Sequence, residues 1–455
     1  MQNNENITLN FVKFKEQKQF ILPWVNISIF ALAVAGVFSI LIVFLRTPYL
    51  QNFLPKDLFS NSLAVHVNLS VLVWMLASLA MWWSIYLNSS KIINLGSAIL
   101  SGLGALIISL SPFYNFDKPA LMNNYVPIID NPFFFMGLLI FLSGILIIST
   151  KVAVNFIVSF NFKDINFNIA ASSSVIVVLA LCSLVAANNQ LKLIPDSSNI
   201  SKFEAYEMLF WGFGHILQFA FTQGFIGALI LITLKDKQIG KGEGFLINLL
   251  LWINCLVTIL PLKIQIAQND LLKDYVVVYT NHMKYYGGMV PTIFMIYSLF
   301  KLIQNKPKPL FNLYTLSIFG SILLFSVGGY LGMQIVGTNV KIPAHYHGSI
   351  VAITIMFMGF YYFLFEKLFD LKFNKSAYYQ IGLYAFGQLM HITGLAISGG
   401  YGALRKNPNQ VIDFKLKITM GIMGLGGLIA IIGGLTFVIN MLKYITNVNK
   451  LYTKK

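Results

Sequence analysis

Two histidines separated by a single residue are the most informative feature of this chain. His345 and His347 lie in Pro343-Ala-His-Tyr-His-Gly-Ser-Ile350, at the start of an apolar stretch long enough to cross a membrane. Because successive residues of an α-helix are about 100° apart, positions i and i+2 point to nearly opposite sides of one helix. Imidazole suits iron, copper and zinc, and ionisable residues at membrane depth are usually functional. The pair therefore predicts a redox metalloprotein of the membrane, in which one helix ligates a metal centre on each flank.

The composition points to the class of protein. Of the 455 residues, 57% are hydrophobic and 11% are charged, whereas soluble chains carry about 25% charged residues. The predicted membrane-spanning segments lie at 21–46, 60–87, 91–111, 132–150, 167–187, 208–234, 244–263, 284–303, 310–332, 343–365, 378–399 and 417–442. We therefore expect an all-α integral membrane protein of about twelve transmembrane helices, with a single membrane domain over residues 1–455.

The charge distribution bears on partners and orientation. The net charge of +16 comes from lysines scattered among the loops, so we expect no nucleic-acid partner. With the N-terminus inside, the inner segments carry more lysine and arginine than the outer ones. We predict a protein integral to the cytoplasmic (inner) membrane, in contact with lipid, with both termini cytoplasmic. Cys182 and Cys255 lie in separate apolar runs, and we expect two buried thiols there.

This orientation gathers four histidines toward one side of the membrane. His66 lies near the start of helix 2, and His215 lies near the start of helix 6. His345 and His347 lie near the start of helix 10. Because even-numbered helices begin on the outer side, we expect the four side chains at similar depth toward the outer face.

Four helices carry sequences that resemble one known family. These are Ala64-Val-His-Val-Asn68 in helix 2, Phe210-Trp-Gly-Phe-Gly-His-Ile-Leu-Gln218 in helix 6, Ala344-His-Tyr-His-Gly-Ser-Ile350 in helix 10, and Met390-His-Ile-Thr-Gly-Leu395 with Gly399-Gly-Tyr-Gly-Ala-Leu-Arg-Lys406 in helix 11. Over nearly the full chain the sequence resembles the catalytic subunit of the haem-copper oxidase superfamily, which is cytochrome c oxidase subunit I-like. The resemblance is closest to the branch of C-type oxidases and nitric oxide reductases, and it implies a bundle of twelve helices.

The resemblance implies two haems and a non-haem metal. His66 and His347 would be the axial ligands of a low-spin haem, and His345 would be the proximal ligand of a high-spin haem whose open face binds a gas. His215 would ligate the non-haem metal, copper or iron, across that face. Axial ligands and pocket polarity tune the haem potentials. Electrons would come from a donor subunit or from a cytochrome c or cupredoxin-type donor.

Three further residues have weaker signals. The resemblance places Arg405 near the haem propionates, because guanidinium pairs bidentately with carboxylates. The alternative is an arginine that extends to the membrane interface. Arg46, the other arginine of the chain, is a candidate for contact with a haem edge. His391 in helix 11 is expected to be structural or to support a ligand, rather than to bind metal itself.

The three-histidine copper site of the family is incomplete in this sequence. The family supplies two adjacent histidines at the end of helix 7, and no His-His pair exists here. In one assignment, Thr280-Asn-His-Met-Lys-Tyr285 replaces the pair. Asn281 and His282 are then possible ligands, and Tyr285 stands where a C-type oxidase has its redox-active tyrosine.

A second assignment is favoured by spacing. Helix 7 would end at Leu260-Pro-Leu-Lys263, so that Leu262 and Lys263 replace the two histidines. The interval from Leu262 to His345 then suits one helix pair with its loops. His282 would lie in an outer loop or at the start of helix 8, and such a loop could still fold inward to the metal.

Helix 6 also departs from the family pattern. Phe219 stands four residues after His215, where A- and B-type oxidases have a tyrosine and typical nitric oxide reductases have a glutamate. Gln218 is adjacent. Glu204 and Glu207, at the outer start of the helix, are candidate proton-entry groups, and simple solvated carboxylates are the alternative.

These departures bear on the reaction. Reduction of dioxygen to water takes four electrons, and the ordinary oxidases use two haems, copper and a tyrosine. Reduction of two nitric oxide molecules to nitrous oxide takes two electrons and no tyrosine radical. We expect a respiratory oxidoreductase, with nitric oxide slightly favoured as the substrate and dioxygen as the alternative. A secondary transporter is a remote alternative, because no internal repeat is visible.

Overall fold

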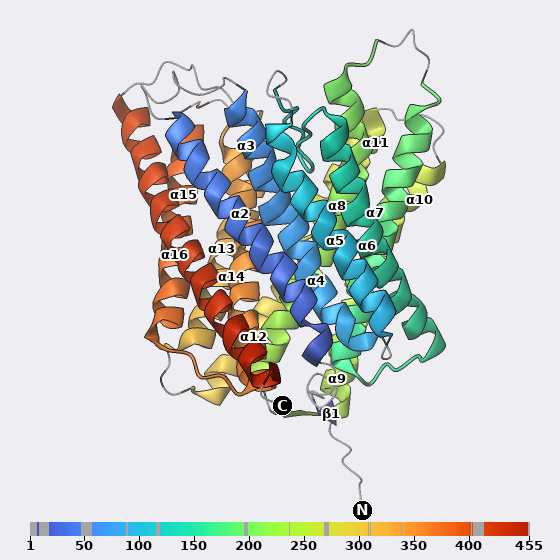
Figure 1. Ribbon diagram of the computed structural model, residues 1–455, viewed down its shortest axis with the longest axis vertical. Coiled ribbons are helices and arrows are strands. Elements are labelled where there is room, and N and C mark those ends of the chain that lie inside the picture. Colours follow the sequence, from blue (N-terminus) through green and yellow to red (C-terminus); the bar gives the residue numbers. More distant parts are fainter. Residues whose placement is uncertain are drawn as a thin grey trace, which may run out of the picture. The chain divides into compact units, whose positions relative to one another are not determined.

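The protein is described from a computed structural model (Figure 1). The structure describes residues 7–8, 18–46, 57–87, 90–114, 119–194, 199–235, 237–267, 273–307, 309, 311–337, 339–401, 403 and 414–453. Within these residues, twelve helices are long and apolar enough to cross a membrane. This confirms the predicted all-α class and the number of spans.

The chain packs as two compact units, Met1–Ile296 and Tyr297–Lys455. The α-helices of the first unit are α2 (Leu22–Arg46), α3 (Leu58–Val67), α4 (Trp74–Trp83), α5 (Lys91–Leu110), α6 (Pro132–Val158), α7 (Ile165–Leu191), α8 (Lys202–Leu234), α9 (Lys241–Leu256), α10 (Ile259–Ala267) and α11 (Lys273–Tyr286). The boundary falls within α12 (Met289–Asn305), and the second unit adds α13 (Leu313–Met333), α14 (Lys341–Phe369), α15 (Lys375–Gly400) and α16 (Phe414–Thr453). The single domain over 1–455 stays a prediction.

Short elements complete the first unit. They are the 3₁₀ turns η1 (Lys18–Phe20), η4 (Ser84–Tyr86) and η5 (Ser111–Phe113), the π-helical segment η3 (Asn68–Val73), and the strands β1 (Ile7–Thr8) and β2 (Gln238–Ile239). The two strands pair antiparallel, with Ile7 opposite Ile239. This pairing fixes Ile7 and Thr8 to the connection between α8 and α9.

The eighth membrane span, which contains α11 and α12, begins earlier than its hydropathy predicted. The span starts at Asp274 rather than at residue 284, so of the two placements expected for His282 the outer loop is wrong and the start of the helix is correct. α11 buries Tyr279 and His282 on one side, while Thr280 and Asn281 are exposed on the other. The exposed polar residues lower the mean hydropathy of the segment. Hydropathy therefore did not reveal this helix, although one of its faces is buried.

The sixth membrane span, which is α8, also begins earlier than predicted, at Lys202 rather than at residue 208. Ser201 caps it by accepting a hydrogen bond from the backbone N–H of Glu204, whose carboxylate accepts one from the Ser201 N–H. His215 therefore lies about three and a half turns inside α8 rather than near its start.

The seventh membrane span is broken between α9 and α10, and Pro261 removes a backbone hydrogen bond at the break. Val257 follows α9, and the residue four positions later is Pro261. Proline has no backbone N–H, so the Val257 carbonyl has no donor at the usual i+4 position. The Val257 carbonyl accepts instead from the Leu260 N–H at 3.3 Å, and its second lone pair is open to a donor from another helix.

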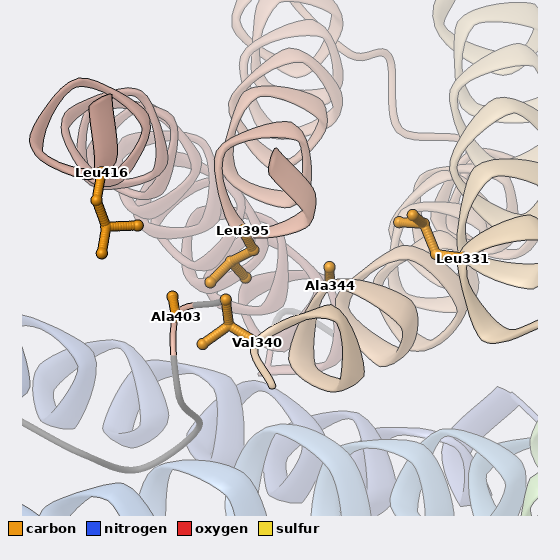
Figure 2. Close-up of a cluster of buried hydrophobic side chains, with 6 residues drawn as sticks. All are labelled: Leu331, Val340, Ala344, Leu395, Ala403 and Leu416. Atoms are coloured by element: carbon orange, nitrogen blue, oxygen red, sulfur yellow. The ribbon is translucent and has the colours of Figure 1, made fainter. Parts of the chain in front are cut away.

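The second unit contains a small apolar cluster that packs the start of α14. Figure 2 shows the side chains of Leu331, Val340, Ala344, Leu395, Ala403 and Leu416 gathered from α13, α14, α15, α16 and the segment that follows α15. Between transmembrane helices such contacts stabilise by close van der Waals packing rather than by removal from water. Ala344 directly precedes His345, so this packing fixes the backbone that carries the histidine pair.

Candidate haem and metal sites

His66 is held on α3 by a backbone carbonyl of α2. Its Nδ1 lies 2.9 Å from the carbonyl oxygen of Ala35. A carbonyl oxygen only accepts, so Nδ1 carries the proton and Nε2 keeps its lone pair. Ring orientation by a carbonyl on the other nitrogen is the usual arrangement of a metal-ligating histidine.

The backbone after His66 adopts an unusual conformation. The π-helical segment η3 begins at Asn68, two residues after His66. The Asn68 amide donates to the carbonyls of Ala64 and Pro127, at 2.9 and 2.7 Å. Ser70 donates to the His66 carbonyl at 2.6 Å. π-helical bulges occur frequently at functional sites, and this one adjoins a predicted haem ligand.

His215 is buried on α8 within a group of aromatic rings. Its ring centre lies 4.8 Å from that of Tyr125, 5.0 Å from that of Trp211 and 5.7 Å from that of Tyr279. Its Nδ1 donates to the Trp211 carbonyl at 2.9 Å. Its Nε2 therefore accepts a hydrogen bond from the Tyr125 hydroxyl at 3.0 Å.

Tyr125 is a residue that the sequence did not suggest. It comes from the connection between η5 and α6, far from any histidine in the sequence. Burial raises the pKa of its hydroxyl well above the usual value, and the nearby carboxylate of Glu207 raises it further. The hydroxyl is therefore neutral and able to donate a hydrogen bond across the ordinary pH range.

Tyr279 is a second tyrosine that hydropathy did not reveal. It is fully buried on α11, and its hydroxyl donates to the side chain of Gln265 at 2.7 Å. Ser183 donates to the same amide oxygen at 2.6 Å. This hydrogen-bonded cluster joins α7, α10 and α11 next to the ring of His215. Tyr285, the tyrosine suggested by sequence, is 70% exposed on α11.

His282 uses the opposite ring nitrogen from His215. Its Nε2 donates at 2.8 Å to the carbonyl of Val257, the carbonyl whose usual i+4 donor is missing because of Pro261. Its ring packs at 5.2 Å from Phe219. Phe219 lies one helical turn beyond His215, so His282 packs against the same helix one turn farther along.

The two proposed replacements for the missing histidine pair lie on different helices. Leu262 is buried on α10, and Lys263 next to it is exposed. Asn281 is exposed on α11, whereas His282 beside it is buried. The adjacent residues of each pair therefore face different surroundings. Ligation by His282 stays a prediction.

His345 and His347 are directed toward different helices of the second unit. Nδ1 of His345 donates to the Gly328 carbonyl of α13 at 2.7 Å. A Cβ at Gly332 would lie 2.6 Å from the His345 ring, so only glycine leaves room for this ring against α13. The His347 ring lies 4.9 Å from that of His391 on α15. The i, i+2 spacing thus presents the pair to different neighbours.

His391 is also oriented by a carbonyl. Its Nδ1 donates to the carbonyl of Met423 on α16 at 2.9 Å. The expected supporting role beside His347 is compatible with this contact and stays a prediction.

Other predicted residues have different outcomes. Arg405 lies outside the described residues, and Arg46 ends α2. Cys255 is buried as expected, but Cys182 is exposed, because it occupies the outward face of α7. Glu204 caps α8.

The donor sets differ in completeness. Four histidines donate Nδ1–H to a backbone carbonyl: His66, His215, His345 and His391. In the described part of the chain, no group of three or more His, Cys, Asp and Glu side chains is close enough to hold a metal ion. His215 is therefore the best-oriented imidazole for a non-haem metal, and it has no second and third partner of these types among the described residues.

Residues 19–436 match the family described as "Cytochrome C and Quinol oxidase polypeptide I". The chain belongs to this family. It is therefore a haem-copper oxidase-type oxidoreductase, and members of the family bind haems and a copper or iron ion. The resemblance of the four histidine-bearing sequences is thereby confirmed at the level of the superfamily.

Two relatives cover most of this cytochrome c and quinol oxidase family chain. An uncharacterized protein of Rickettsia prowazekii (strain Madrid E) is 31% identical over an alignment of 479 positions that covers 90% of this chain and 92% of the relative. An uncharacterized protein of Aquifex aeolicus (strain VF5) is 28% identical over 349 residues, which are 76% of this chain and 84% of the relative.

The residues present fit the haems of the family. His66 and His345 each carry their proton on Nδ1 and keep the Nε2 lone pair for iron. Gly332 forms a recess that a Cβ would fill, and the His345 ring occupies it. For the non-haem metal, the fit extends to His215 alone.

Proposed function

We propose that the protein is a terminal reductase of the respiratory chain that converts nitric oxide to nitrous oxide. His66 and His347 would hold the low-spin haem, and His345 would hold the high-spin haem. When bound, the haems supply stored electrons and an open iron face for a gas. The reaction consumes two nitric oxide molecules, two electrons and two protons, and it yields nitrous oxide and water.

One observation carries this proposal. His215 keeps a correctly oriented imidazole, while buried Leu262 and exposed Lys263 occupy the positions that spacing assigns to the other copper ligands. His282 has its Nε2 engaged by the Val257 carbonyl. A single imidazole holds copper less well than three, and this favours the reaction that requires fewer electrons.

Dioxygen reduction is the second candidate, and one contact favours it. Phe219 stands where A- and B-type oxidases have a tyrosine, which disfavours dioxygen reduction. The Tyr125 hydroxyl, however, lies 3.0 Å from Nε2 of His215, and Tyr279 packs against the same ring. A tyrosine is therefore adjacent to the proposed metal ligand, although it comes from a different part of the chain. The support for nitric oxide rests on the missing imidazoles alone.

The remaining roles are part of the same proposal. The electron donor would be a partner subunit, a cytochrome c or a cupredoxin-type protein. The protein would lie in the cytoplasmic membrane with both termini cytoplasmic, and Arg405 would bind a haem propionate.

A single preparation tests the reaction. Metal content and the consumption of nitric oxide and of dioxygen are measured with the same electron donor. We expect two haems per chain, substoichiometric copper, and faster consumption of nitric oxide than of dioxygen. Full copper occupancy with rapid dioxygen consumption would reverse the proposal.

A further inference from the structure

Residues 119–131, which precede α6, form a closed loop in the first unit. The backbones of Leu121 and Ile128 exchange two hydrogen bonds, at 2.7 and 2.8 Å, which close the loop as a short antiparallel pair. At its end, Asn131 accepts a hydrogen bond from the Phe134 N–H at 2.7 Å and so caps α6. The loop is therefore fixed by its own pairing and by the start of a helix.

This loop is hydrogen-bonded to the helix of His66 on both sides of the histidine. Ser60, before His66, accepts from the Ala120 N–H at 3.2 Å. Asn68, after it, donates its amide to the Pro127 carbonyl at 2.7 Å. Ser60 and Asn68 are separated by about 12 Å along the helix. Two contacts this far apart restrain both the tilt and the rotation of the backbone that carries His66.

Asn68 stands where the α-helix changes to the π-helical segment η3. Its side chain is buried, and its amide also donates to the Ala64 carbonyl at 2.9 Å. The nearby His66 ring depends on this backbone, because its Nδ1–H must reach the Ala35 carbonyl of α2, at 2.9 Å. Such a hydrogen bond on the second nitrogen sets the ring orientation of a ligating histidine.

The loop is also fastened to α8. The Glu207 carboxylate accepts from the backbone N–H of Asn124 at 3.0 Å and from the Asn123 amide at 3.2 Å. It accepts from the Asn124 side chain as well. Hydrogen bonds to an ionised carboxylate are stronger than neutral ones. Glu207 is thus an anchor of the loop, a contact that differs from the proton entry suggested by the sequence.

We propose that Asn68 is a positioning residue for the low-spin haem, because it ties the backbone that carries His66 to the 119–131 loop and, through that loop, to α8. The inference rests on the proposed role of His66 as a haem ligand and involves no non-haem metal. A histidine held at its backbone and at Nδ1 presents Nε2 to the iron at one angle. Without the tie, the imidazole takes a range of angles, and the spectrum of low-spin iron changes with its axial ligands and their hydrogen bonds.

Asn68→Leu tests the proposal, because it removes both amide hydrogen bonds and keeps a side chain of similar size. Haem content and low-temperature electron paramagnetic resonance are measured on the full-length, haem-loaded protein. We expect both haems to remain, the low-spin signal to shift and broaden, and the carbon monoxide complex to be unchanged. Asn166→Leu is the matched control, because Asn166 is buried on α7 and its amide has no hydrogen-bond partner among the described residues. An unshifted signal in Asn68→Leu, or an equal shift in Asn166→Leu, overturns the proposal.

Asn68→Ser separates the two hydrogen bonds and serves if the leucine variant does not fold. A serine hydroxyl is able to donate to the carbonyl one turn earlier, as Ser70 does to His66, but it is shorter than the amide that reaches Pro127. The shift should therefore equal that of Asn68→Leu. A low-spin signal like that of the unmodified protein would show that the loop does not position His66.

Glu207→Ala loosens the loop from the side of α8 and leaves the helix of His66 unaltered. We expect a smaller shift of the same low-spin signal, because Ser60 and Asn68 still hold the loop. Glu204→Ala is its control and should leave the signal unchanged, since the Glu204 carboxylate bonds to Ser201 instead. Equal signals in the two variants contradict the connection through the loop.

His66→Ala separates this inference from the proposed function. If that variant retains the full low-spin signal, His66 is not a ligand and the haem assignment fails. If His66 is required but Asn68→Leu is indistinguishable from the unmodified protein, only the role of Asn68 fails.

Discussion

The surroundings of His345 and of His215 differ in what holds the ring. The His345 ring is held within its own unit by one carbonyl and one glycine recess on the neighbouring helix α13. The His215 ring is held by its own helix at Nδ1, while the hydroxyl of Tyr125, from the segment before α6, donates to Nε2. A ring oriented through Nδ1 alone keeps its metal-binding nitrogen available. A ring engaged at both nitrogens must lose a contact before it binds metal.

His282 extends the contrast. It donates through Nε2 to a carbonyl whose usual i+4 donor is missing because of proline, so the nitrogen usually available to a metal is the one already used. In the first unit, two imidazoles near α8 therefore have opposite tautomers. This difference suggests that one histidine of the pair serves the site and the other serves the packing of α9, α10 and α11.

The largest expected effect is on gas binding. His345 would be the sole protein ligand of the gas-binding iron, so His345→Ala should abolish carbon monoxide binding by the reduced protein. His347→Ala should disturb the low-spin haem and retain carbon monoxide binding. Spectra of the reduced protein with and without carbon monoxide measure both. The same spectral loss in both variants would show that the two rings do not serve different haems.

A second large effect concerns His66. His66→Ala removes one axial ligand of the low-spin haem, so its bis-histidine signal should disappear. The high-spin haem and its carbon monoxide complex should remain. Low-temperature electron paramagnetic resonance distinguishes the two species. Retention of the full low-spin signal would contradict the assignment of His66.

A smaller effect is expected from the glycine recess. Gly332→Ala places a methyl group against the His345 ring, which should destabilise the protein by about 1–3 kcal/mol and shift the high-spin spectrum. Gly329→Ala on the same helix is the matched control, because a Cβ there has no neighbour within 4 Å. Spectra and thermal unfolding of both variants are compared. Equal spectral shifts would rule out a specific role for the recess.

The smallest effect on cofactors is expected from His282. His282→Ala should leave both haems and the bound metal unchanged. It should lower stability by about 1–3 kcal/mol, because the Val257 carbonyl loses the shorter of its two hydrogen bonds. Adding Pro261→Ala supplies an N–H at the i+4 position and should restore part of that loss. Loss of metal with both haems intact would instead show that His282 is a ligand.

Much of the fold could be predicted from the sequence, because a transmembrane helix depends on the hydropathy of one continuous stretch of residues. Apolar runs of about twenty residues predicted the twelve spans, and the structure has them. The failures lie where a helix has a polar face, as in α11, or a capped polar first turn, as in α8. In both helices the buried side packs against neighbours, and hydropathy along the chain cannot detect a neighbour.

The sequence by itself determined the family and the spacing of His345 and His347, because helical periodicity depends only on nearby residues. The tertiary structure alone decided which groups surround His215. Tyr125 reaches it from the segment before α6, where the Asn124 N–H donates to the Glu207 carboxylate. Asn124 and Glu207 are 83 positions apart in the chain. His282 donates to the Val257 carbonyl, whose usual i+4 donor is missing because of Pro261 in another helix. Such contacts depend on loop docking and on helix breaks, and no local pattern in the sequence records where two distant segments meet.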